Sequence, residues 1–298
     1  MPVYNGEPYL EEALESILAQ SFDDFELVIS DNASTDRTGE ICRRYAAKDE
    51  RIRYFTMAQN LGVIENFNSV FHLSTGRYFK WAAADDICGP DYLRQAVDVL
   101  DRDPTVVLVW AKTVGIDGRG EPVALPNEVS DLNSRRSVYS PDPVVRFRRL
   151  LRNMWWVDGP FYGVMRAQAL AETRWLHPRH ISGDQILLTE LSLKGRFFEL
   201  PGETFYSRVH SDKTSRQQRT LRDRVVLVDQ KAPGRGPASW WRLLRGYPQR
   251  LGMYTMIIWA ARISLMQKLA CQAELGYTVA SWAWLRARQL ASGASPWR

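Results

Sequence analysis

The chain has 298 residues, of which 45% are hydrophobic and 24% charged, a balance typical of a folded protein with a sizeable core in one or two domains. Its cysteines, Cys42, Cys88 and Cys271, are scattered and lack CxxC spacing. This argues against a disulfide framework or a structural zinc site and fits a reducing compartment. The start of the chain also lacks the residue order of a signal peptide. We therefore expect a cytoplasmic protein.

The net charge of +5 is unevenly distributed. Residues 216–298 hold 14 Lys and Arg against 3 Asp and Glu, a local +11 that leaves −6 on residues 1–215. No recognisable nucleic-acid module accompanies these basic residues, so we expect no nucleic-acid partner. An anionic membrane surface fits the basic part better, which would place the protein at the inner face of a membrane.

Strand-like and helix-like segments alternate along the first half of the chain. It opens at Met1 with what looks like the tail of a strand. The pattern then predicts helices over 7–20, around 41–45, over 63–73 and over 90–100, and strands over 25–30, 52–55, 78–82 and 106–110. Such alternation indicates an α/β fold: a doubly wound, mostly parallel sheet with helices on both faces.

Carboxylates follow two of the predicted strands. Asp85 and Asp86 come after the apolar run that starts at Tyr78, and Asp31 and Asp36 follow the strand over 25–30. Adjacent like charges persist where a cation lies against them, most often a divalent metal. Open α/β sheets bind ligands beyond the carboxyl ends of their strands, so we expect these side chains to share one crevice.

The sequence lacks the glycine-rich loops of common phosphate sites, since neither GxxxxGK[ST] nor GxGxxG follows the first strand. A diphosphate bound here would therefore be neutralised by a metal held on carboxylates. This argues against a dinucleotide-dependent dehydrogenase and a P-loop nucleotidase.

These motifs together resemble the family 2 glycosyltransferases of the GT-A fold. The resemblance is carried by Pro2-Val3-Tyr4-Asn5-Gly6, Asp31-Asn32-Ala33-Ser34-Thr35-Asp36, Asn60-Leu61-Gly62 and Gly76-Arg77-Tyr78 leading to Asp85-Asp86. It implies an inverting transferase that uses a nucleoside-diphosphate sugar and Mg²⁺ or Mn²⁺. It also implies that the donor nucleotide contacts Pro2, Tyr4, Asn5, Asp31, Asn60, Gly62 and Asp85.

The chain departs from the family's D-x-D motif, because Ala83 stands where the first carboxylate is expected. Asp85 would then hold the metal with Asp86 or with a later ligand. The resemblance offers His210 as that ligand, although a lone histidine at a strand end is often a packing residue. Arg208 and Lys213 could neutralise the departing diphosphate, or could lie on a solvated basic face.

Two features indicate where an acceptor sugar could bind: a segment rich in aromatic residues, and an acidic residue at the start of a helix. Trp155 and Trp156 could line a sugar site, since flat rings suit the C–H faces of sugars, or could be core residues. Asp184 precedes an apolar helix and could cap it, with Ser182 and Gln185 forming a capping box. In the resembled family an acidic residue at this place is the general base that deprotonates the acceptor.

We therefore predict a metal-dependent, inverting glycosyltransferase acting on a saccharide or lipid-linked acceptor. Residues 1–115 would form the nucleotide-sugar-binding half of a GT-A domain, 116–215 the acceptor-binding half, and 216–298 a basic helical extension. Residues 239–291 of that extension could pack on the catalytic domain or lie on a membrane surface. The alternatives are a nucleotidyltransferase and a degenerate scaffold that only binds sugar or membrane.

Overall fold

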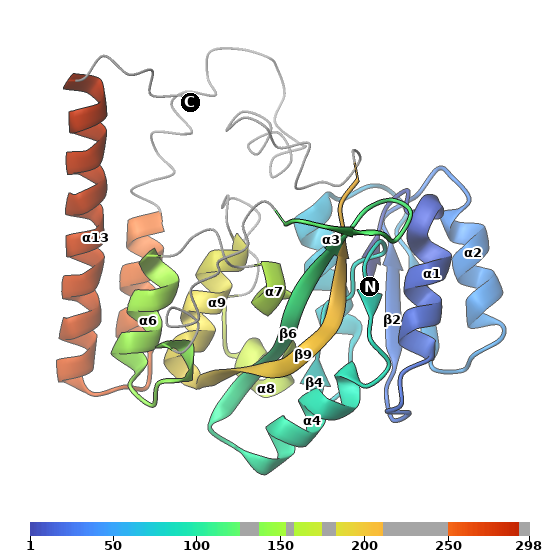
Figure 1. Cartoon of the computed structure of the whole chain (residues 1–298), viewed down its shortest axis with the longest axis horizontal. Helices are drawn as coiled ribbons and strands as arrows, with labels where there is room; N and C mark the ends of the chain where they lie inside the picture. Colours follow the sequence, from blue (N-terminus) through green and yellow to red (C-terminus); the bar gives the residue numbers. More distant parts are fainter. Residues whose placement is uncertain (126–136, 153–157, 175–182, 211–249, 292–298) are drawn as a thin grey trace.

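The computed structural model describes residues 1–125, 137–152, 158–174, 183–210 and 250–291 (Figure 1). In these ranges strands and helices alternate through the first half of the chain, as the sequence pattern predicts. The helices lie on both faces of the sheets, so the predicted α/β class is confirmed. The C-terminal helices follow as an extension at one side of the molecule.

The first part of the chain forms a three-stranded parallel sheet in the order β1-β2-β3. Its strands are β1 (Pro2–Val3), β2 (Leu27–Asp31) and β3 (Ile52–Thr56), connected by the helices α1 (Glu7–Leu18) and α2 (Thr38–Ala46). Helix α1 begins with Pro8 in its first turn, where the missing amide costs no hydrogen bond. Its apolar residues recur at helical spacing and are buried: Leu10, Ala13, Leu14 and Ile17.

The second sheet is mixed, with strand order β4-β8-β6-β9-β5 and β7 paired to β6. The strands are β4 (Tyr78–Phe79), β5 (Ile87–Cys88), β6 (Val106–Ile116), β7 (Pro122–Val123), β8 (Val164–Arg166) and β9 (Arg196–Arg208). Only the β6–β9 pair is parallel among the described pairs of this sheet. The strand predicted over 78–82 ends early at Phe79, whereas the one predicted over 106–110 extends to Ile116 along β9.

The β6–β9 ladder contains irregularities that reset its register. Ala111 pairs with Leu200 but Ile116 pairs with Arg208, so five steps along β6 correspond to eight along β9. Gly202, within the extra residues, has φ = +94°, a left-handed conformation that favours glycine. Such bulges bend a strand and redirect the side chains beyond them.

Helices from both halves bury two main apolar clusters on opposite faces of the sheets. Helices α1, α2 and α4 (Tyr92–Arg102) pack over one cluster. Helix α3 (Val63–Leu73) and helix α9 (Gly183–Lys194) pack over the other, where the rings of Trp81 and Phe161 stack 4.8 Å apart. Helix α9 is buried around almost its whole circumference, and so is a central core element.

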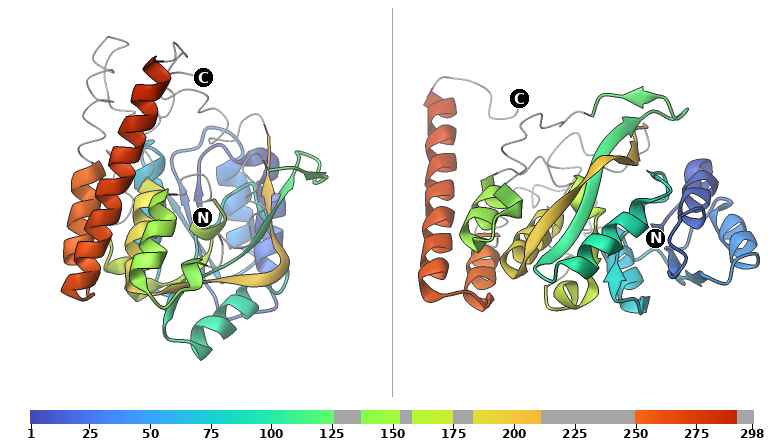
Figure 2. Two further views of the ribbon diagram at one scale, coloured as in Figure 1. Left: turned by 60° about the vertical axis from the view of Figure 1, so that its left-hand side comes forward. Right: turned by 60° about the horizontal axis from the view of Figure 1, so that its bottom comes forward.

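The remaining described helices are short or lie at the edge of the molecule. They are η1 (Ser137–Tyr139), α6 (Pro143–Arg152), α7 (Asp158–Phe161), α8 (Ala167–Ala171), a helical segment over residues 250–260, and α13 (Leu265–Ala291). Figure 2 shows α13 as a long outer helix beside α6 and the 250–260 segment. Within the described ranges, no helix has the length and apolar character needed to cross a membrane.

The N-terminus makes folding stability dependent on pH. The α-amino group of Met1 is buried and donates a hydrogen bond to the Val28 carbonyl oxygen at 2.6 Å. Burial, helped by the positive charge of Lys80, lowers the pKa of this amine from 8.0 to about 5. The unfolded chain therefore binds a proton that the folded chain does not between these two pH values.

We expect the free energy of unfolding to fall as the pH is lowered from 8 to 5, by up to about 4 kcal/mol from this amine. Urea unfolding at several pH values measures the slope. Protein acetylated at Met1, which has no charge there, is the matched control and should show a smaller slope. Equal slopes for the two forms would contradict the assignment.

Candidate functional site

The loops that leave β1 and β2 are joined by hydrogen bonds. The amide of Asn5 donates to Ser34 Oγ at 2.9 Å, and Asn5 Oδ1 accepts from the amide of Thr35 at 2.9 Å. Asn5 adopts φ = 50°, a left-handed conformation that asparagine tolerates better than most residues. Beside it, the side chain of Tyr4 is 49% exposed and so is accessible to a ligand.

Asp31, at the end of β2, is almost fully buried. Its Oδ1 accepts a hydrogen bond from the amide of Ser34 at 2.9 Å, and its Oδ2 accepts one from the hydroxyl of Tyr54 at 2.9 Å. Burial and the charge of Asp31 raise the pKa of the nearby Cys42 thiol to about 12. Tyr54 was not predicted as a site residue, because a tyrosine in a strand carries no sequence signal for such a role.

Asn32 organises the segment that enters α3. Its Nδ2 donates to Asn60 Oδ1 at 3.0 Å and to the Gly62 carbonyl at 3.2 Å, while its Oδ1 accepts from the Leu61 amide at 2.8 Å. Gly62 has φ = 92°, so a side chain there would strain the backbone. The predicted donor residues Asn60 and Gly62 thus lie directly beside the β2 loop. Asn32 belongs to a predicted motif but was not assigned a role.

Asp36 also holds the loops after β1 and β2 together through hydrogen bonds. It accepts hydrogen bonds from the amides of Thr38 at 3.0 Å and Glu7 at 3.2 Å. Burial alone would raise the pKa of this carboxyl, but the hydrogen bonds from Thr38 and Glu7 outweigh it, and the net pKa is lowered. Asp36 therefore fixes the α1 and α2 starts relative to each other.

Asp85 and His210 lie together although they are far apart in the sequence. His210 Nε2 lies 3.0 Å from Asp85 Oδ2, and the two side chains are 14% and 21% exposed. The ring of Tyr9, on α1, packs against His210 with 4.7 Å between ring centroids. His210 follows the C-terminal end of β9, Asp85 lies in the segment after β4, and Tyr9 is on α1. The fold therefore brings these three side chains together from distant parts of the chain.

Asp86 and Arg208 are buried next to this pair. The Arg208 amide donates to Asp86 Oδ1 at 2.9 Å. The Arg208 guanidinium donates to the carbonyl oxygens of Asp85 and Asp117, each at 3.0 Å, and to the Glu12 carboxylate. With its side chain 1% exposed, Arg208 is a structural anchor. The Arg208 guanidinium thus donates to two backbone carbonyl groups and Glu12 in the interior, and Asp86 is buried beside it.

A divalent cation would bind at this site only if a bound substrate and water supplied further oxygen atoms to complete its coordination. Within the described residues, no group of three or more His, Cys, Asp and Glu side chains is placed to hold a metal. Asp85 offers a carboxylate and His210 an imidazole, and the nearest atoms of the two groups, Asp85 Oδ2 and His210 Nε2, lie 3.0 Å apart. Mg²⁺ and related cations often take few protein ligands and complete their coordination with phosphate oxygens and water. The two residues fit that mode of binding.

Asp184 lies within the first turn of α9, which begins at Gly183 and so starts before the residue that was expected to precede it, and Asp184 is half-buried. Its Oδ1 accepts a hydrogen bond from the Gln185 amide at 2.8 Å. Gln185 is held in turn by Arg250, whose guanidinium donates to Gln185 Oε1 at 2.8 Å. The C-terminal 250–260 helix thus supports the turn that carries Asp184, a contact that no sequence motif indicated.

Some predicted site residues fall outside the described ranges. These are Trp155, Trp156, Ser182 and Lys213. Pro2 is described, and it is buried in β1 opposite Ser30 of β2.

Comparison with known proteins gives consistent matches. The model of glycosyl transferase family 2 matches residues 1–169. Glycosyltransferase GlyA of Streptococcus pneumoniae is 36% identical over 31% of this chain and 13% of its own length. An uncharacterized protein of Mycobacterium tuberculosis is 30% identical over 62% of this chain and 54% of its own. The chain thus spans about half or less of the length of these relatives.

Solved structures share the fold at lower identity. TarS 1–349 of Staphylococcus aureus, in complex with UDP-GlcNAc, superposes with a TM-score of 0.62 at 19% identity, over 93% of this chain and 70% of that one. The mannosyltransferase PcManGT of Pyrobaculum calidifontis, in complex with GDP-Man and Mn²⁺, gives 0.55 at 20% identity, over 97% and 79%. The fold of this chain is therefore of the GT-A type.

We expect Arg208→Met to lower the free energy of unfolding by about 3–5 kcal/mol, because it leaves the carbonyl groups of Asp85 and Asp117 and the Glu12 carboxylate without their guanidinium donor. Urea unfolding monitored by tryptophan fluorescence measures this. Arg37→Met is the matched control, since Arg37 is 61% exposed and pairs with Glu40 on the surface. A loss below 1 kcal/mol for Arg208→Met would contradict the anchoring role.

Proposed function

Because the chain belongs to glycosyltransferase family 2, we propose that it transfers a sugar from a nucleoside-diphosphate donor to an acceptor hydroxyl in one inverting displacement. The observation that carries this proposal is the Asp85–His210 pair, which packs against Tyr9 in the first turn of α1, the helix that follows the β1 loop. In this proposal the base, the ribose and the diphosphate of the donor would bind between the pair and the loops after β1 and β2. The division into donor half (1–115), acceptor half (116–215) and extension (216–298) belongs to the same proposal.

The nucleoside would bind against the interlocked loops. Tyr4 is exposed and supplies a ring face, and Asn5, Asn60 and Gly62 present polar backbone and side-chain groups close by. Asp31 would accept hydrogen bonds from the base with its remaining lone pairs, while Ser34 and Tyr54 hold it in place. Pro2 would act indirectly, by fixing the start of the Tyr4 loop.

The donor diphosphate would lie against Asp85 and His210. A bound Mg²⁺ or Mn²⁺ would be held by these two side chains and would supply charge that stabilises the departing diphosphate. PcManGT, whose structure contains Mn²⁺ and GDP-Man, supports this use of a metal. With Ala83 in place of a carboxylate, His210 would provide the second protein ligand.

Asp184 would be the general base. A carboxylate at a helix start is held in position by the helix, and here Gln185 and Arg250 brace that turn. It would accept the proton of the acceptor hydroxyl while that oxygen attacks the anomeric carbon of the sugar. The acceptor would be a saccharide or a lipid-linked saccharide, with Trp155 and Trp156 proposed as its aromatic contacts.

The rivals are a nucleotidyltransferase and a scaffold without turnover. The first would release pyrophosphate, and the second would release neither product. Both differ from a glycosyltransferase, which releases a nucleoside diphosphate from a nucleotide sugar. The nature of the phosphate product therefore separates all three.

The C-terminal helices suggest that the enzyme works at a membrane surface. Of the twelve exposed large apolar side chains in the described residues, nine lie between Leu251 and Trp284. Those of α13 include Met266 (74% exposed), Tyr277 (62%) and Trp284 (60%). The guanidinium groups of Arg152 and Arg288 lie 4.9 and 5.4 Å from the rings of Tyr277 and Trp284. Exposed apolar groups flanked by cations fit an anionic bilayer.

We expect release of UDP or GDP from a nucleotide sugar to require Mn²⁺ or Mg²⁺, and Asp85→Ala to lower this turnover at least 100-fold. A coupled assay for free nucleoside diphosphate, run across donors with and without metal, tests it. Asp98→Ala, an exposed carboxylate change on α4, is the matched control and should keep full activity. Absence of metal-dependent turnover with every donor would contradict the proposed metal-dependent glycosyl transfer.

Asp184→Asn should lower the transfer rate by about 100- to 10,000-fold, the range for loss of a general base. Donor affinity, measured by titration calorimetry with the nucleoside diphosphate and Mn²⁺, should stay within a few fold, because Asp184 lies outside the proposed donor site. Retained transfer would assign Asp184 to helix capping alone.

Binding to vesicles tests the membrane contact. We expect sedimentation with vesicles that contain phosphatidylglycerol, and a loss of at least tenfold in affinity when Leu265, Met266 and Trp284 are replaced together by Ser. Phe198→Ser, an exposed apolar change on β9, serves as control. Equal binding of the triple variant, or equal binding to vesicles of phosphatidylcholine alone, would contradict the proposal.

A further inference from the structure

The helical segment over residues 250–260 has two faces of different character. Its inner face is apolar at helical spacing, and four of its side chains are at most 7% exposed: Met253, Tyr254, Ile257 and Ile258. Its outer face presents large apolar side chains to the surroundings: Leu251 (38% exposed), Met256 (51%) and Trp259 (47%). The segment is therefore one helix thick between the core of the protein and whatever lies outside it.

The inner face of this segment contacts the turn that carries Asp184. The guanidinium of Arg250 donates a hydrogen bond to Gln185 Oε1 at 2.8 Å, and Gln185 Nε2 donates to the Leu150 carbonyl of α6 at 3.3 Å. Gln185 directly follows the proposed base and donates its amide to Asp184 Oδ1. Apolar residues of α9 and α6 pack with the same inner face. The position of Asp184 relative to the segment is thus fixed by hydrogen bonds and by packing.

The charge of the C-terminal helices complements an anionic surface. Residues 250–291 contain five Lys or Arg and a single acidic residue, Glu274. Glu274 forms ion pairs with Arg148 and Arg152 of α6 at 2.7 and 2.6 Å, so its charge is balanced within the protein. The remaining charge of this stretch is positive, and it accompanies the exposed apolar side chains. Both properties favour a bilayer with anionic lipids as the occupant of the outer face.

The thickness of the segment sets the distance between such a bilayer and the proposed base. An α-helix with its side chains measures about 10–12 Å across, and the Arg250 side chain adds the reach to Gln185. With the outer face on a bilayer, Asp184 would lie about 20 Å from the lipid headgroups. A general base must come within hydrogen-bond distance of the hydroxyl that it deprotonates. The reacting hydroxyl of the acceptor would therefore also lie close to the membrane.

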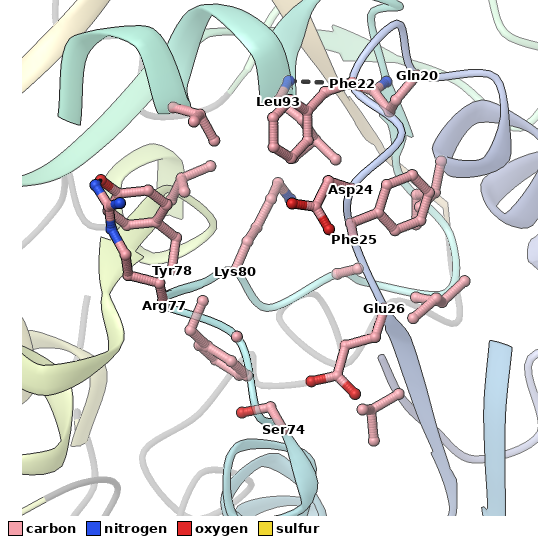
Figure 3. Close-up of a pocket in the computed structure, with 18 of the residues that line it drawn as sticks. Gln20, Phe22, Asp24, Phe25, Glu26, Ser74, Arg77, Tyr78, Lys80 and Leu93 are labelled. Atoms are coloured by element: carbon pink, nitrogen blue, oxygen red, sulfur yellow. Dashed lines mark hydrogen bonds between the residues drawn. The ribbon is translucent and has the colours of Figure 1, made fainter. Parts of the chain in front are cut away.

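A cavity in another part of the fold provides no route to Asp184. It has a volume of about 450 Å³ and lies between β2 and β4. Figure 3 shows Phe25 and Glu26 on one side of it and Arg77 and Tyr78 on the other. Residues between Met1 and Asp101, together with Val164, form its wall, and neither Asp184 nor the C-terminal helices line it. The cavity therefore does not compete with an approach of the acceptor along the C-terminal helices.

We propose that the acceptor is anchored in the membrane, as a saccharide carried by a lipid whose hydroxyl meets Asp184 beside the C-terminal helices. This inference rests on the proposed glycosyl transfer and membrane contact, and it selects the lipid-linked acceptor over a free saccharide. A lipid headgroup with a short glycan would bridge the distance between the bilayer and the base. Confinement of enzyme and acceptor to one surface also raises their effective concentration, a gain that a free saccharide lacks.

Energy transfer tests the distance without requiring turnover. The native cysteines Cys42, Cys88 and Cys271 are buried, so a maleimide dye labels an introduced cysteine selectively. The full chain carries a coumarin at Asp184→Cys, Trp259→Cys or Arg43→Cys and is bound to phosphatidylglycerol vesicles that contain rhodamine-labelled lipid. Arg43 is exposed on α2, on the side of the molecule away from α13 (Figures 1 and 2).

We expect energy transfer from Trp259→Cys and Asp184→Cys to exceed that from Arg43→Cys by about twofold or more, because the base would lie only about 20 Å from the bilayer. Equal transfer from Asp184→Cys and Arg43→Cys would overturn the proposal. The same labelled proteins with vesicles of phosphatidylcholine alone supply the unbound reference.

Acceptor preference is measured on the unmodified chain. Each candidate sugar is offered as a methyl glycoside in solution and as a glycoside of dipalmitoylglycerol in phosphatidylglycerol vesicles, with nucleotide sugar and Mn²⁺. We expect transfer to the lipid form to be at least about tenfold faster at equal concentration. The variant with Leu265, Met266 and Trp284 replaced by Ser should lose this preference. Equal rates for the two forms of every sugar that is used would overturn the proposal.

The two measurements separate this inference from the function on which it rests. Transfer to soluble and lipid-linked sugars at equal rates would leave a glycosyltransferase but overturn the membrane-anchored acceptor. Absence of nucleoside diphosphate release with every donor would overturn the transferase itself. The energy transfer depends on neither result, so a distant Asp184 label would overturn the inference even in an active enzyme.

Discussion

The buried guanidinium of Arg208 is the contact on which the proposed active site depends. It joins the end of β9 to the Asp85 carbonyl, to the Asp117 carbonyl after β6, and to Glu12 on α1. These partners are far apart in the sequence, and no apolar contact could fix their backbone groups as firmly. A buried charge is stable only with such complete pairing, so the anchor also demands that all three segments be in place at once. His210, two residues later, takes its position from this arrangement.

The loops after β1 and β2 follow a different principle. There the side chains of Asn5 and Asp36 accept hydrogen bonds from backbone amides of the neighbouring loop. Asp31 accepts one from the Ser34 amide of its own loop, and Asn32 accepts one from the Leu61 amide just before α3. Short polar side chains of this kind can replace the regular hydrogen bonds that loops lack. The result is a polar edge on which Tyr4 and Asn5 are the exposed residues among the proposed donor contacts, whereas Pro2, Asp31 and Gly62 are buried.

The sequence predicted the α/β class, most of the strands and helices up to residue 110, and the family, because those depend on local periodicity and short motifs. It did not predict the mixed second sheet, since β4, β5 and β7 are only two residues long and their pairing is set by distant partners. It placed Asp85 beside His210 through the family resemblance, not through any spacing in the chain. The burial of Arg208 and the support of Asp184 by Arg250 arise from tertiary contacts, which leave no pattern in the sequence.

The three extra residues of β9 opposite the middle of β6 act as a spacer. Because eight residues of β9 cover the length of five on β6, the strand delivers Arg208 opposite Ile116. An uninterrupted ladder would place Phe205 there, and the guanidinium and imidazole would lie about 10 Å further along the strand direction. The position of the proposed metal ligand is thus set by the number of residues around Gly202 and not by their chemistry. Substitutions in this bulge should be tolerated where the left-handed turn survives, whereas a change in its length would separate His210 from Asp85 without touching either residue.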